Sequence, residues 1–84
     1  MSSRLIKLIT KMKTQPNNIS YEELTYVLIT IGCERRDGKG SHFIFHLPGS
    51  NARLTVPKKK PVKACYIRQA VRIFSLEDLL DEEN

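Results

Sequence analysis

Two histidines, His42 and His46, are the side chains of this sequence best suited to move protons near neutral pH. Both lie in the segment Ser41–Leu47, whose aromatic and β-branched residues predict a strand. Because side chains alternate between the two faces of a strand, Phe43 and Phe45 are expected to face the core while both histidines point away from it. His42 follows a glycine-flanked turn whose backbone amides can approach a phosphate. The sequence therefore predicts an exposed histidine beside an anion site.

The charge distribution indicates a polyanionic partner. Residues 1–74 carry 14 basic and 4 acidic side chains, a net charge of +10, and the other 5 acids lie in the last eight residues. A small domain this basic suits nucleic acid or an anionic membrane surface, and a soluble basic domain with a solvated tail is the alternative. We expect the phosphate contacts to come from Lys39, Gly40, Ser41, Arg53, Lys58, Lys59, Lys60, Lys63 and Arg68, helped by Arg35, Arg36 and Arg72.

RNA is a polyanion that proton transfer alone can cleave. A base removes the proton of the 2′-hydroxyl, the oxygen attacks the adjacent phosphate, and an acid protonates the leaving 5′-oxygen. Nearby cations stabilise the phosphorane, and one well-placed histidine contributes typically ~10²–10⁴-fold. His42 suits this role, although a solvated surface histidine is the alternative. The Cβ of His46 should lie roughly 13 Å from that of His42, so we expect His46 to be a surface or RNA-contacting residue.

Other chemistries find little support in the sequence. Cys33 and Cys65 do not combine with the histidines in a zinc-site spacing, so no metal is expected and both cysteines are interpreted as small buried apolar residues. Ser41 lacks the context of a nucleophile elbow, and the turn at residues 37–40 is too short for a phosphate-binding glycine loop. We therefore expect no cofactor.

The expected location is the cytoplasm. Two cysteines in a chain of 84 residues fit a reduced intracellular protein better than a secreted one. No apolar run approaches the roughly 18–20 residues that span a bilayer, and the N-terminus does not resemble a signal peptide. A membrane partner is therefore not expected.

The remaining elements must position this strand. Apolar spacing predicts helices, Ser20 and Glu23 form a capping box before the second of them, and Pro57 stops the last strand. We expect helices at 3–13, 20–31 and 64–74, strands at 33–36, 41–47 and 52–56, and a basic connector at 58–63. This order predicts an α+β fold with helices on one face of a three-stranded antiparallel sheet and the other face open.

The chain is expected to form one domain over residues 1–84. It comprises an N-terminal helix at 1–14, a core at 19–74 and an acidic tail at 75–84. The core has the αβββα order of the double-stranded-RNA-binding fold. The tail could fold over the basic face and compete with RNA, but an exposed disordered end is the simpler expectation, with some docking by Leu76, Leu79 and Leu80.

Several short motifs resemble the HicA family, the toxins of bacterial and archaeal toxin–antitoxin pairs. The resemblance covers roughly residues 16–74. It depends on a G-S-H motif at the start of the second strand, a V-P pair closing the third strand, and a K-P element before the last helix. The matching segments are Gly40–Phe45, Pro48-Gly49, Leu54–Pro57, Lys60-Pro61 and Ile67–Gln69.

The resemblance implies a double-stranded-RNA-binding-like fold and mRNA interferase activity, with His42 as the catalytic residue. It also implies a partner antitoxin, HicB, that covers this histidine. Cys33 stands where the family usually has a large apolar residue, which affects packing more than chemistry. The leading hypothesis is a metal-independent endoribonuclease that cleaves mRNA. A non-catalytic RNA-binding module is the alternative, and a DNA-binding or protein-interaction domain fits less well because no helix-turn-helix layout is present.

Overall fold

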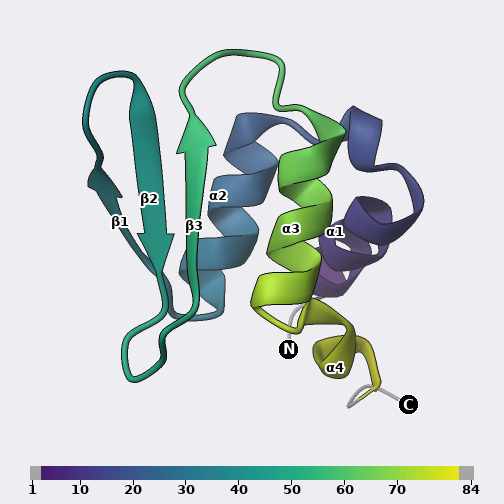
Figure 1. The fold of residues 1–84 in the computed structure, drawn as a ribbon. Coiled ribbons are helices and arrows are strands. Elements are labelled where there is room, and N and C mark those ends of the chain that lie inside the picture. The colour runs from purple at the N-terminus through teal and green to yellow at the C-terminus, as the bar shows by residue number, and fades with distance from the viewer. Residues whose placement is uncertain (1–2, 82–84) are drawn as a thin grey trace.

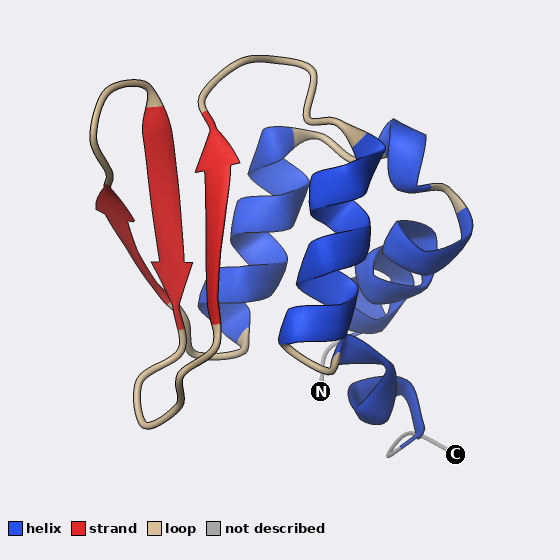
Figure 2. Cartoon of the chain, viewed as in Figure 1, coloured by secondary structure: helices blue, strands red, loops and turns tan. Residues whose placement is uncertain are grey.

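Helices and strands follow the chain in the predicted order. The computed structural model describes residues 3–81 and confirms the α+β fold with a three-stranded antiparallel sheet and an extra N-terminal helix. The sheet forms one layer and the helices form the other (Figures 1 and 2). The elements are α1 (Ser3–Thr14), the 3-10 turn η1 (Pro16–Asn18), α2 (Tyr21–Thr30), β1 (Glu34–Asp37), β2 (His42–His46), β3 (Arg53–Pro57), α3 (Ala64–Ile73) and α4 (Leu76–Asp81).

The sheet has the order β1-β2-β3, with both pairs antiparallel. Residues directly opposite each other in such a pair share a face. Phe45 pairs with Leu54, and both are buried on the side that α2 and α3 cover (Figure 1). His42 pairs with Pro57 and lies on the other face, where its side chain is exposed. The period-two alternation therefore placed the histidine on the open face, as predicted.

The beginning and end of α2 follow the predicted capping chemistry. The Ser20 hydroxyl oxygen accepts a hydrogen bond from the Glu23 backbone N–H at 3.0 Å, and the Glu23 carboxylate accepts one from the Ser20 N–H at 2.9 Å. Each bond satisfies a backbone donor that the first helical turn leaves unpaired. At the other end, Gly32 has a φ of +112°, a conformation that side chains with a Cβ rarely adopt, and the chain turns there into β1.

The acidic tail was expected to be an exposed disordered end, but most of its described part is helical. Residues 76–81 form α4, and Leu76 is fully buried. Ser75, with a φ of +50°, turns the chain between α3 and α4, which lets Leu76 reach the core. Glu77 forms an ion pair with Lys13 of α1 at 3.6 Å. The burial of Leu76, one of the three leucines expected to dock, therefore ties this segment to the helical layer. Glu82 and Glu83 lie outside the described residues.

The two cysteines occupy different environments. Cys33 is buried as predicted, and its burial raises the pKa of the thiol to about 11, so the thiol stays protonated at neutral pH. The prediction that Cys65 is buried is wrong: Cys65 is exposed. It is the second residue of α3, whose buried residues Ile67 and Ala70 lie on another side of the helix.

Candidate active site

The backbone on both sides of His42 is held by hydrogen bonds. The Gly38 N–H donates to the His42 carbonyl at 2.9 Å, which closes the turn between β1 and β2. The Lys58 N–H donates to the Ser41 carbonyl at 2.7 Å and so ties the preceding residue to the end of β3. Gly40 has a φ of +67°, the left-handed conformation that this turn requires. An exposed imidazole thus projects from a fixed backbone.

Phe43 anchors the same end of β2 on the opposite face. Its ring stacks on Tyr21 of α2 with a centroid separation of 5.2 Å. Two cations lie against the same ring, the Arg35 guanidinium carbon at 4.8 Å from the centroid and the Lys58 Nζ at 4.6 Å. Such contacts stabilise by about 0.5–1 kcal/mol each at exposed sites. The stacking of Phe43 on Tyr21 thus holds the start of β2 against α2, at the residue next to His42.

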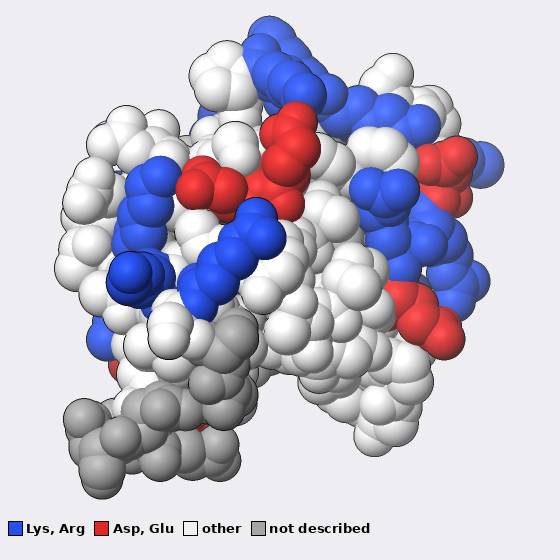
Figure 3. All heavy atoms as spheres, turned by 180° about the vertical axis from the view of Figure 1, so that it is seen from behind, with Lys and Arg blue, Asp and Glu red and all other residues white. Residues whose placement is uncertain are grey.

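Most of the predicted phosphate-binding residues lie at the end of the sheet where β2 begins and β3 ends. We call this end, which includes His42, the histidine edge. The turn before β2 and the connector after β3 both leave the sheet there (Figure 1). Seen from behind, Lys and Arg side chains run along the upper edge of the molecule beside acidic ones (Figure 3). The histidine edge comprises Lys39, Gly40, Ser41, His42, Lys58, Lys59, Lys60 and Lys63.

Two lysines of the histidine edge are already paired. Lys58 forms an ion pair with Asp37 at 3.4 Å, and Lys60 forms one with Glu22 at 2.8 Å. The hydrogen bond from Lys60 lowers the pKa of the Glu22 carboxyl, and the same bond raises the pKa of the Lys60 ammonium. Within residues 3–81, Lys39, Lys59 and Lys63 have no ion-pair partner. Among the lysines of the histidine edge, these three are therefore the most available to a phosphate.

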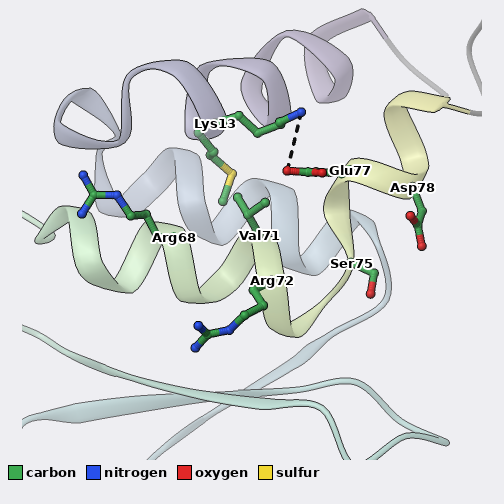
Figure 4. Close-up of a pocket in the computed structure, with 8 residues that line it drawn as sticks. Lys13, Arg68, Val71, Arg72, Ser75, Glu77 and Asp78 are labelled. Carbon is green, nitrogen blue, oxygen red and sulfur yellow. Dashed lines mark ion pairs between the residues drawn. The ribbon is translucent and has the colours of Figure 1, made fainter.

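Two residues predicted for the same site lie elsewhere. Arg53 pairs in register with His46, four residues along β2 from His42, which places it roughly 13 Å along the sheet. Arg68 lies on α3, where it lines a groove of about 510 Å³ between the helices together with Lys13, Arg72 and Glu77 (Figure 4). The structure therefore does not bring Arg53 and Arg68 together with His42.

His46 is less accessible than predicted. Its side chain is half-buried, and its Nδ1 is buried without a hydrogen-bond partner among the described residues. On the open face it lies between Glu34 of β1 and Arg53 of β3. The sequence distinguishes the faces of a strand but not the cover that neighbouring strands give, so the two histidines looked more alike than they are.

Sequence reasoning missed a pocket beside the histidine edge. It has a volume of about 180 Å³ and lies between the end of β3, the connector and the start of α3. Its lining includes Tyr66, which is half-buried directly before the core residue Ile67. The sequence offered one signal, an aromatic residue soon after a basic connector that contains Pro61 and follows Pro57.

Within the part of the chain that the structure describes, no three His, Cys, Asp or Glu side chains gather into a group that could hold a metal ion. The helices found in residues 3–81 are too short or too polar to cross a bilayer.

Comparison with known proteins gives one family. The model of the family described as HicA toxin of bacterial toxin–antitoxin systems matches residues 21–75, from the first residue of α2 to the turn between α3 and α4. No curated protein and no solved structure gives a significant match. The match includes β2 with His42, both neighbouring strands and the lysine connector, and it leaves out α1 and α4. Because it covers well over half of the sequence, the chain belongs to the HicA family of toxin–antitoxin toxins.

Proposed function

We propose that the protein is an endoribonuclease that cleaves mRNA with His42 as its acid–base residue. One observation supports this most directly: an exposed imidazole stands on a hydrogen-bonded backbone at the histidine edge, together with three lysines that have no ion-pair partner within residues 3–81. A group placed in this way can approach a ribose and its phosphate from solvent. Membership of the HicA family makes RNA the expected polyanion.

The proposed reaction needs two proton transfers and no redox step. Neutral His42 takes the proton of the 2′-hydroxyl, and the ribose oxygen forms a bond to the adjacent phosphorus. The bond from phosphorus to the 5′-oxygen then breaks, and the imidazolium returns its proton to that oxygen. The products are a 2′,3′-cyclic phosphate and a free 5′-hydroxyl. Ammonium groups of Lys39, Lys59 and Lys63 would stabilise the charge that develops on the phosphorane.

A toxin of this kind needs control, and we propose a HicB-like antitoxin as the protein partner. The histidine edge offers it an exposed imidazole and three lysines, Lys39, Lys59 and Lys63, for which the described part of the chain holds no ion-pair partner. An acidic surface that fits over this edge would exclude RNA by occupying the same lysines. Electrostatic complementarity of this type also speeds association.

The test replaces each histidine in turn. His42→Ala should abolish cleavage of single-stranded RNA and growth arrest, while His46→Ala, the matched control, should keep both. Cleavage is measured by gel electrophoresis of a labelled RNA in EDTA, with circular dichroism to confirm folding. Full activity of His42→Ala would refute the assignment. RNA binding by the unaltered protein without any products would favour a non-catalytic RNA-binding module.

A further inference from the structure

The pocket beside the histidine edge has an apolar interior and a cationic rim. Val56 and Val62 are buried at its floor, while Pro57 and Tyr66 are half-buried walls. The exposed residues at its rim are Lys59, Lys60, Pro61 and Lys63. This combination suits a ligand with a flat apolar body and a negative charge attached to it.

The size of the pocket limits that ligand to about one ring system. Its volume of about 180 Å³ is below the roughly 300–1,000 Å³ of pockets that take drug-sized molecules. Unpaired bases of single-stranded RNA are commonly read by stacking on an aromatic side chain. Tyr66 is the aromatic side chain in this pocket.

The pocket is also close enough to His42 to hold part of the same RNA. Pro57 lines the pocket and is the direct pairing partner of His42 across β2 and β3. Paired residues in antiparallel strands have Cα atoms about 4.5–5.5 Å apart. Lys59 and Lys63, which have no ion-pair partner within residues 3–81, are both at the rim. If the phosphate of one nucleotide lay between these two lysines, the base of that nucleotide would be at the pocket. The next phosphate of the strand would then point toward His42.

The connector leaves backbone groups available for a base edge. Among residues 3–81, its backbone hydrogen bonds lie at its two ends, where the Lys58 N–H donates to Ser41 and the Lys63 carbonyl accepts from Tyr66. We propose that this pocket is a base-binding subsite, which takes one unpaired nucleobase of single-stranded RNA next to the phosphate that the 2′-oxygen attacks after His42 has removed its proton. The location relative to the scissile bond rests on the proposed ribonuclease function, whereas base binding itself does not.

The experiment measures binding without requiring cleavage. His42→Ala protein is titrated with two oligonucleotides of equal length and charge, one made entirely of abasic spacers and one carrying a single base. Stacking of a base on an aromatic side chain corresponds to about 5- to 140-fold in affinity, so the single base should tighten binding by a factor in this range. Tyr66→Leu should remove this gain, and Tyr66→Phe, the matched control, should keep it.

A spectroscopic measurement makes the test independent of the variants. With 2-aminopurine as the single base, stacking on Tyr66 should quench its fluorescence on binding. Equal affinity for the two oligonucleotides, or unquenched 2-aminopurine, would overturn the base-binding subsite even if the protein cleaves RNA. If the single base tightens binding but the protein with His42 unaltered never cleaves RNA, the ribonuclease proposal is refuted and the base-binding subsite stands.

Discussion

The salt dependence of RNA binding should distinguish the histidine edge from the rest of the basic surface. The change replaces its three unpaired lysines with glutamine, as Lys39→Gln, Lys59→Gln and Lys63→Gln in one protein. These side chains are exposed and have no ion-pair partner within residues 3–81. Their removal should therefore cost RNA affinity without breaking an ion pair of the folded chain.

The magnitude follows from counterion release. Each phosphate of a single strand that a cation neutralises contributes about −0.7 to the slope of log K against log salt concentration, so three contacts contribute about −2. Between about 50 and 200 mM salt, this slope corresponds to roughly a 20-fold loss of affinity. In the triple variant the slope should be shallower by about 2, because these three contacts are missing.

The assay is fluorescence anisotropy of a labelled single-stranded RNA, with His42→Ala in every protein to prevent cleavage. The matched control, Arg53→Gln with Arg68→Gln and Arg72→Gln, removes the same charge from exposed residues away from the histidine edge. It should lower affinity slightly and keep the slope near that of the parent. An unchanged slope in the lysine variant, or an equal loss in both, would refute the assignment of phosphate contacts to this edge.

Two further predictions concern stability. Leu76→Ala should lower the free energy of unfolding by about 2–5 kcal/mol because Leu76 is fully buried. Replacement of the exposed neighbour, Glu77→Ala, should have only a small effect. Urea titration measures both, and equally small losses in the two variants would contradict the docking of α4. The pKa of the Glu23 carboxyl is lowered, first by the hydrogen bond from the Ser20 backbone N–H and then by Lys11. The ionised carboxylate therefore stabilises the folded protein above its ordinary pKa of 4.5, and this contribution is lost as the pH falls through the pKa of the folded state. Glu23→Gln should therefore flatten the fall in stability as the pH drops below about 4.5, and an unchanged pH profile would contradict this.

Strand alternation and helix capping predicted much of the fold because each depends only on residues that are close in the sequence. Alternation along β2 placed His42 on the open face, and the Ser20–Glu23 pair marked the start of α2. Both depend on residues within one turn or one strand. All three strands differ from the predicted bounds by one residue: β1 and β3 are shifted to Glu34–Asp37 and Arg53–Pro57, and β2 is one residue shorter at each end, at His42–His46. The pairing of neighbouring strands sets where each ladder begins and ends.

The composition of the candidate site was harder to predict because it depends on contacts between distant segments. The sequence ranks lysines by charge, and it does not reveal that Glu22 reaches Lys60 or that Asp37 reaches Lys58. It likewise grouped Arg68 with His42, although α3 carries Arg68 into the groove between the helices (Figure 4). Tyr66 was overlooked because its pocket exists only once the connector, β3 and α3 come together.

The segments outside the family match supply part of the core without covering the candidate site. Of the 17 buried core residues described, 6 lie outside residues 21–75, namely Leu5, Leu8, Ile9, Met12, Ile19 and Leu76. α1 and α4 contact each other and α3, on the side of α3 remote from the sheet (Figure 1). A domain of this size has little apolar surface to bury, so these residues matter to its stability. Stabilisation thus comes from one side of the molecule, which leaves the open sheet face and its histidine free for a ligand.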